Sequence, residues 1–64
     1  MIRVTRLNQH VVVINTELIK MIESTPDTLI TLINGDTLMV RESVDEVVDK
    51  AMEWARQVRG FRVV

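Results

Sequence analysis

A chain of 64 residues makes one small domain, and a domain of this length buries only about 60% of the surface that its unfolded chain exposes. The sequence has no cysteine and a single histidine, His10, which excludes disulfides, thiolate chemistry and zinc sites built from several Cys or His ligands. Its net charge is −1, and acidic and basic residues are interspersed. This argues against a protein that binds nucleic acids or anionic membranes, since such proteins normally carry an excess of basic residues.

The N-terminal part of the chain predicts a β-hairpin. Residues 2–7 alternate apolar and polar side chains, which is typical of a strand with one buried face. Residues 11–15 begin with four β-branched residues in succession, which crowd a helix and favour a second strand. The polar segment Asn8-Gln9-His10 between them suits the turn of an antiparallel hairpin.

Residues 15–25 allow two interpretations. The first is a short helix capped by Asn15. The second is a strand over residues 18–23, in which Ile19 and Met21 share one face. We favour the strand, because the segment is short for a helix and a strand continues an unbroken antiparallel meander.

The middle of the chain gives the strongest hairpin signal. Residues 28–33 and 37–41 are rich in β-branched and apolar residues and flank Asn34 and Gly35, which both tolerate positive φ. A two-residue turn would mix apolar and polar side chains on both faces. A three-residue loop that includes Ile33, with Gly35 left-handed as a bulge, shifts the register by one residue. The apolar side chains of the two strands then lie on one face. The bulged turn is therefore predicted, and its apolar face consists of Ile30, Leu32, Leu38 and Val40.

The opposite face of this hairpin is more apolar than a solvated face needs to be. Large apolar side chains lie there among threonines and one arginine, and exposed apolar patches of this kind mark partner surfaces. We therefore predict an interaction surface, termed the hairpin face. Its residues are Leu29, Thr31, Ile33, Thr37, Met39 and Arg41.

Residues 44–59 predict a C-terminal amphipathic helix. It begins with a capping box in which Ser43 and Glu46 satisfy each other's backbone amides, and Gly60 is placed to stop it. Its apolar stripe is expected to pack on the apolar face of the hairpin, with Trp54 at the border of the stripe and interpreted as core. The stripe consists of Val44, Val47, Val48, Ala51, Ala55 and Val58.

These elements predict an α+β fold. Residues 1–64 form a single domain, an antiparallel sheet of four or five strands with one helix packed on one face. A single helix covers only one side of a sheet, so the hairpin face and the all-Val second strand need other cover. A strongly curled sheet or a second copy of the chain would supply it, and we predict a homo-oligomer.

The sequence predicts no enzyme, and we expect no catalytic residue, cofactor or metal. His10 lies in a predicted turn without a second His or Cys and is interpreted as a solvated residue. Asp45, Asp49 and Glu53 line one helix face at a spacing of four, where a solvated surface is favoured over a weak cation site. Ser43 has no His partner nearby, and its capping role accounts for it.

The sequence also predicts a cytoplasmic location. No apolar run approaches the roughly 20 residues that span a bilayer. Arg3 and Arg6 interrupt the N-terminal segment where a signal peptide would be apolar.

A family resemblance runs in order through nearly the whole chain. The residues that carry it are Ile2-Arg3-Val4-Thr5-Arg6-Leu7-Asn8, Asn15, Leu18-Ile19, Ile22-Glu23, Pro26-Asp27-Thr28-Leu29-Ile30-Thr31-Leu32, Asn34-Gly35 and Val40-Arg41-Glu42-Ser43-Val44-Asp45-Glu46-Val47-Val48. With them the sequence resembles the small flagellar FlbD family, which includes the swarming motility protein SwrD. Gln9 departs from the pattern, because glycine or another small turn residue is expected after Asn8, and the tail after Gly60 lies outside the shared part.

The resemblance implies a cytoplasmic, non-enzymatic accessory protein of the bacterial flagellum that supports motility and swarming and affects motor power. Proteins of the flagellar motor or export apparatus are the implied partners, and the flagellar base is the implied location. The family brings no catalytic residues. A small nucleic-acid-binding or regulatory module is the alternative, for which the arginines would gather into a basic edge.

Overall fold

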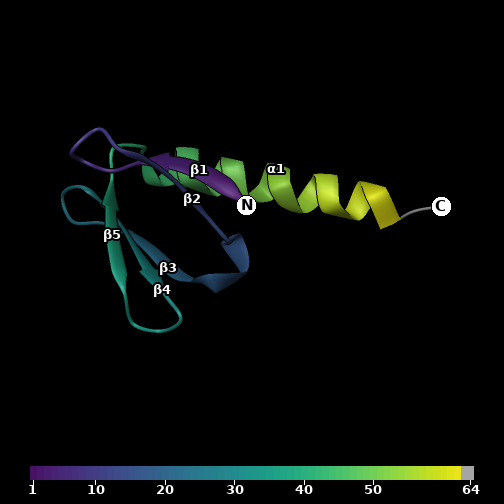
Figure 1. The fold of residues 1–64 in the computed structure, drawn as a ribbon, viewed down its shortest axis with the longest axis horizontal. Helices are drawn as coiled ribbons and strands as arrows, with labels where there is room; N and C mark the ends of the chain where they lie inside the picture. The colour runs from purple at the N-terminus through teal and green to yellow at the C-terminus, as the bar shows by residue number, and fades with distance from the viewer. Residues whose placement is uncertain (63–64) are drawn as a thin grey trace.

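The computed structural model describes the backbone of residues 1–62 and the side chains of residues 1–58. Along the chain follow β1 (Ile2–Thr5), β2 (Val11–Ile14), the 3-10 helix η1 (Thr16–Leu18), β3 (Ile19–Ser24), β4 (Thr28–Leu32), β5 (Thr37–Val40) and α1 (Val44–Arg62). All strand pairings are antiparallel. The predicted α+β class, with five strands and one C-terminal helix, is confirmed (Figure 1).

The five strands form two sheets, so the expected meander is interrupted after β2. Strands β1 and β2 make one sheet, and β3, β4 and β5 make the other. Between them the Asn15 side chain caps η1 by accepting a hydrogen bond from the Glu17 N–H at 3.0 Å, and this turn keeps β3 from pairing with β2. The sheets join at one corner, where Arg6 bridges Val40 and the Arg41 N–H donates to the Thr5 carbonyl at 2.8 Å.

Strand β3 contains a β-bulge that the sequence analysis did not anticipate. Ile19 pairs with Leu32 and Met21 with Thr31, so Lys20 is the extra residue. The bulge reverses the alternation of side chains after it. The strand interpretation of this segment is confirmed, but the prediction that Ile19 and Met21 share a face is wrong: Ile19 packs against the core, whereas the Met21 side chain is exposed.

The β4–β5 hairpin has the predicted bulged turn. The Leu32 N–H donates to the Asp36 carbonyl at 2.8 Å, and the Gly35 N–H donates to the Leu32 carbonyl at 2.9 Å. Gly35 has φ +95°, in the left-handed region that favours glycine. Ile30 therefore pairs with Leu38, and the apolar residues share one face as predicted.

The β1–β2 hairpin repeats the same turn with a different residue at the left-handed position. The Gln9 N–H donates to the Arg6 carbonyl at 2.9 Å, and the Arg6 N–H donates to the His10 carbonyl at 2.8 Å. Asn8 accepts from the N–H two residues ahead, as Asn34 does in the other hairpin. Gln9 has φ +76°, so the residue that departs from the family pattern occupies a conformation that L-residues other than glycine rarely adopt.

Replacing Gln9 by glycine is expected to stabilise the protein. A left-handed conformation costs a non-glycine residue about 1–2 kcal/mol, whereas glycine loses about 0.5–1 kcal/mol more chain entropy on folding. The difference predicts that Gln9→Gly raises the free energy of unfolding by about 0.5–1 kcal/mol. Chemical denaturation measures this change. The reverse substitution, Gly35→Gln, should lower stability by a similar amount, because a Cβ at Gly35 meets no atom within 4 Å. Unchanged stability in Gln9→Gly would show that the turn carries no strain.

The hydrophobic core joins both sheets to the helix. Its buried members are Ile2, Val4, Ile30, Leu38, Val40 and Val47. Val47 is the helical member of this cluster, and it packs with residues from β1, β4 and β5. Val47 therefore packs on the apolar face of the hairpin as predicted, and α1 also lies beside β1 and β3.

Only part of the predicted helical stripe faces this core. Val44 and Ala51 are half-buried, and Trp54, placed at the border of the stripe, is half-buried against the core. Val48 and Val58 are exposed, together with Ala55, so their assignment to the packed stripe is wrong. The C-terminal end of α1 projects from the body of the molecule (Figure 1).

The C-terminal end of α1 also differs from the prediction. The helix continues through Gly60 to Arg62, so the expected stop at Gly60 is wrong. The side chains of the tail from Arg59 onward, including the arginines expected near the helix end, lie outside the described residues. Among the described residues, no helix is long and apolar enough to cross a membrane.

Candidate interaction surface

The hairpin face lies on the outer side of the three-stranded sheet, away from the core. Leu29 pairs with Met39 and Thr31 with Thr37, and these positions alternate with the buried residues of β4 and β5. Ile33 is in the turn, with 62% of its surface exposed. The register thus places Leu29, Thr31, Thr37 and Met39 on one side of the sheet, whereas Arg41 follows the end of β5. Met39, Thr37, Ile33 and Arg41 are exposed, whereas Leu29 and Thr31 are half-buried.

Strand β3 extends this surface with two residues that the sequence analysis missed. Met21 pairs with Thr31, and Glu23 pairs with Leu29. The bulge at Lys20 is what turns Met21 outward, and the sequence carries no signal for a bulge at that position. The surface therefore has two rows across the sheet: Glu23, Leu29 and Met39 in one, and Met21, Thr31 and Thr37 in the other.

The chemistry of this surface suits contact with another protein. Three large apolar side chains are exposed on it, namely Met21, Ile33 and Met39. Methionine side chains are unbranched and polarisable, so they adapt to the shape of a partner. On the central strand β4, the half-buried Leu29 and Thr31 lie between Met21 of β3 and Met39 of β5. Exposed apolar side chains that gather on one sheet face in this way mark interaction surfaces.

Glu42 has a structural role that the sequence analysis also missed. Its carboxylate accepts the Thr5 N–H at 2.9 and 3.1 Å and the Thr5 hydroxyl at 2.9 Å. Burial by itself raises the pKa of Glu42. The hydrogen bonds from Thr5 and from the backbone N–H of Glu42, with the positive charge of Lys50, outweigh burial and hold this pKa below its ordinary value. Glu42 therefore ties β1 to the segment that joins β5 to α1.

The capping box at the start of α1 is present as predicted. The Ser43 N–H donates to Glu46 Oε1 at 3.0 Å, and the Glu46 N–H donates to Ser43 Oγ at 3.1 Å. This pairing accounts for both side chains as structural elements, because each satisfies an amide that has no partner within the helix.

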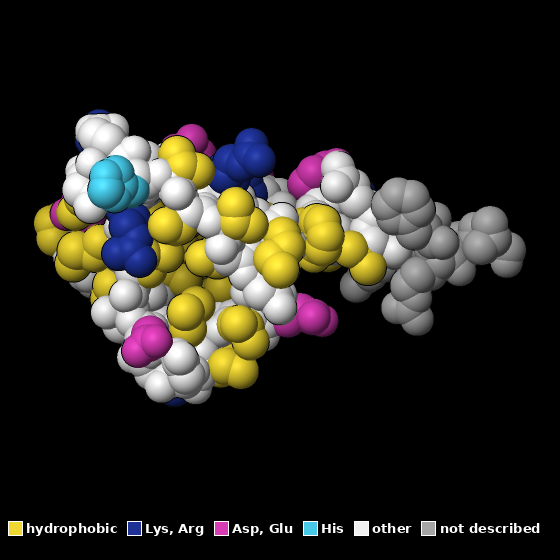
Figure 2. Space-filling view, viewed as in Figure 1, with side chains coloured by type: hydrophobic (Ala, Val, Ile, Leu, Met, Phe, Trp, Pro, Cys, Tyr) yellow, Lys and Arg dark blue, Asp and Glu magenta, His cyan; other side chains and the backbone are white. Residues whose placement is uncertain are grey.

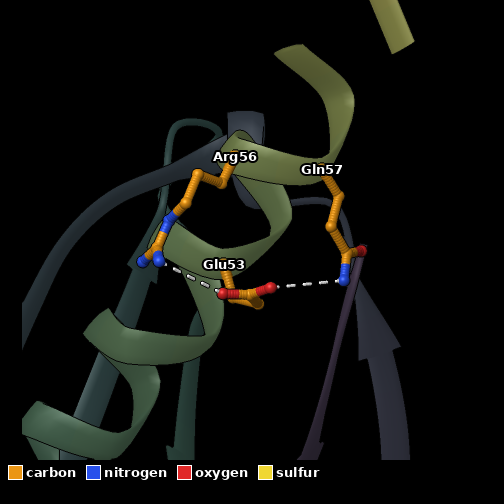
Figure 3. A network of polar contacts seen from close by, with 3 residues as sticks. All are labelled: Glu53, Arg56 and Gln57. Carbon is orange, nitrogen blue, oxygen red and sulfur yellow. Dashed lines mark hydrogen bonds and ion pairs between the residues drawn. The ribbon is translucent and has the colours of Figure 1, made fainter. Parts of the chain in front are cut away.

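The acidic face of α1 is engaged in surface contacts at Glu53. Its carboxylate lies 3.6 Å from the Arg56 guanidinium and accepts a hydrogen bond from the Gln57 side-chain amide at 3.4 Å (Figure 3). An exposed pair of this kind contributes little to stability. Within residues 1–62, no group of three or more His, Asp or Glu side chains is arranged to hold a metal ion.

Comparison with known families decides what kind of protein this surface belongs to. The model of one family, described as FlbD, Flagellar and Swarming motility proteins, matches residues 1–59. The chain belongs to the FlbD family. The match includes every strand and the whole packed part of α1, and it leaves out the tail from Gly60. No curated protein and no solved structure matches the chain. Membership in the FlbD family therefore associates this fold with flagella and swarming motility.

Proposed function

We propose that this FlbD-family chain is a non-enzymatic accessory protein of the flagellum that binds a flagellar protein through the hairpin face and thereby affects motor power. The single observation that carries the binding proposal is the exposed apolar surface formed by Met21, Ile33 and Met39. Family membership supports the flagellar context. A protein of the motor or of the export apparatus is the proposed partner, and the cytoplasmic side of the flagellar base is the proposed location.

The absence of an enzymatic role is part of the proposal. Glu42 is the carboxylate with a lowered pKa, and its oxygens are engaged by Thr5, which supports a structural role. His10 lies in the β1–β2 turn, where its backbone N–H donates to Asn8 Oδ1. His10→Ala is therefore the informative test of catalysis, since Glu42→Ala would also weaken the fold. Loss of motility in a folded His10→Ala variant would contradict the proposal.

The alternative function is binding of nucleic acid through the arginines. Arg6 and Arg41 both lie at the corner where the sheets join, whereas Arg56 is on α1 and pairs with Glu53. A nucleic-acid complex would lose affinity steeply as salt concentration rises. Binding to mixed-sequence DNA or RNA at two salt concentrations separates this alternative from the proposal.

Met39→Glu tests the proposed surface. The Met39 side chain is 42% exposed on the sheet side away from the core, so a carboxylate there stays hydrated and the fold is expected to tolerate it within about 0.5 kcal/mol. Partner binding should be lost, because an unpaired charge would be desolvated in an apolar interface. Swarm expansion of a strain that carries the variant measures the effect. Met52→Glu, at a methionine on α1 that is 57% exposed and lies outside the hairpin face, is the matched control. Normal swarming by Met39→Glu would contradict the assignment of the surface.

A further inference from the structure

Strand β2 has one paired edge and one open edge. The hydrogen bond from the Arg6 N–H to the His10 carbonyl sets the phase of the ladder between β1 and β2. Bonded and non-bonded pairs alternate along an antiparallel ladder, so the N–H and C=O groups of Val12 point towards β1. Those of Val11 and Val13 point away from β1, along the open edge.

This open edge lacks the features that usually prevent strand association. On the other sheet, β3 has a bulge at Lys20 and carries the charges of Lys20 and Glu23, and both features discourage pairing with another strand. In contrast, residues 7–16 contain no Asp, Glu, Lys or Arg. The side chains of Val11 and Val13 are 59% and 58% exposed.

A groove lies beside β2, between the two sheets. Its volume is about 600 Å³, and its lining combines apolar residues of both sheets, such as Val12 and Leu38, with the charged Arg6 and Asp36. Figure 2 shows hydrophobic side chains gathered on one face of the molecule, from the strands to the helix, with a hollow among them. The sheet on this side has only two strands, so β2 is an edge strand.

We propose that a second copy of this chain pairs with the open edge of β2. The two β2 strands lie antiparallel about a two-fold axis that passes beside Val12. Val11 of each copy then faces Val13 of the other, and these residues exchange their outward N–H and C=O groups. The two Val12 side chains meet in a non-bonded pair at the axis, where side chains approach most closely.

A second copy fits this edge because the edge is complementary to itself. Every facing pair is neutral, so no like charges meet across the axis. The two-stranded sheets merge into one four-stranded sheet, which removes both open β2 edges and closes the assembly as a dimer.

The area involved predicts a weak dimer. A stable dimer buries about 800 Å² on each partner, which is roughly a sixth of the 4802 Å² surface of this chain. A pair of four-residue strands buries less than that, so the dimer is expected to dissociate on dilution. The open edge of β2 belongs to the two-stranded sheet, whereas the hairpin face lies on the three-stranded sheet. Met39→Glu should therefore leave the dimer intact.

Sedimentation velocity of the full chain tests the proposal. Between about 10 μM and 1 mM the sedimentation coefficient of the unmodified chain should rise from the monomer to the dimer value. Val13→Pro removes an outward N–H without removing a bond to β1, and it should stay monomeric throughout this range. Val13→Thr keeps the N–H and a branched side chain, and it should dimerise like the unmodified chain. Far-UV circular dichroism verifies that each variant is folded.

Cysteine cross-linking tests the register of the pairing. The chain has no cysteine, so Val12→Cys introduces a single thiol on each copy. Facing residues of a non-bonded pair have Cα atoms about 4.5 Å apart, within the range that a disulfide spans. Val12→Cys should therefore form a disulfide dimer on mild oxidation, at least ten times faster than Val11→Cys or Val13→Cys, whose thiols lie off the axis.

Three results would overturn the proposal. The first is an unmodified chain that remains monomeric at about 1 mM. This result is also expected if the open edge of β2 pairs with an extended segment of a different protein. The second is a dimer that persists in folded Val13→Pro. The third is cross-linking of Val11→Cys as fast as that of Val12→Cys.

Discussion

Val47→Asp is expected to unfold the domain. Val47 is fully buried and packs with apolar side chains of β1, β4 and β5. An unpaired carboxylate there costs about 3–5 kcal/mol, and the lost packing of the valine adds to this. A 64-residue domain has a total stability of only about 3–10 kcal/mol, so the variant should be largely unfolded at room temperature. Far-UV circular dichroism and the width of amide proton signals measure this directly.

Val48→Asp is the matched control for that prediction. It places the same charge one residue further along the same helix, at a side chain that is 37% exposed. The carboxylate stays hydrated and lies in the N-terminal half of α1, so this variant should remain folded. If Val47→Asp folds as well as Val48→Asp, the helix does not pack on the sheets as the structure shows.

Glu42→Gln is expected to lower the free energy of unfolding by about 1–2 kcal/mol near pH 7, because hydrogen bonds to a carboxylate are stronger than those to an amide. The folded pKa of Glu42 lies below its ordinary value of 4.5. The carboxylate therefore contributes stability above the unfolded pKa, and this contribution is lost as pH falls through the folded pKa. The difference in free energy of unfolding between the unmodified chain and Glu42→Gln should be constant from neutral pH down to the ordinary pKa of 4.5. Below that pH it should shrink. Urea denaturation at a series of pH values measures this difference.

Glu17→Gln controls for the loss of one negative charge, since Glu17 is exposed on η1. It should change stability little at any pH. A Glu42→Gln variant that is as stable as Glu17→Gln at pH 7 would show that the carboxylate does not hold Thr5 in solution.

Features set by neighbouring residues were predictable from the sequence. The bulged turn follows from Asn34-Gly35 and the parity of the flanking strands, and the capping box follows from the spacing of Ser43 and Glu46. The register of the hairpin depends on the same turn, which is why Leu29, Thr31, Thr37 and Met39 lie on one side of the sheet.

Features set by distant contacts were not predictable in the same way. Thr5 and Glu42 are 37 residues apart, and nothing in the local sequence of either indicates the contact. The bulge at Lys20 responds to the pairing of β3 with β4, and it brings Met21 onto the hairpin face. Which apolar residues of α1 become buried depends on where the sheets end, and helix periodicity alone cannot locate that point.

The torque of tethered cells tests the central claim most directly. Torque and the number of flagella per cell would be measured in a deletion strain and in strains that carry the unmodified chain or Met39→Glu. The proposal predicts normal flagellar number with low torque in both the deletion and the Met39→Glu strains, and normal torque with the unmodified chain. Missing flagella would place the protein in assembly instead of motor power. Normal torque in the deletion strain would contradict the account.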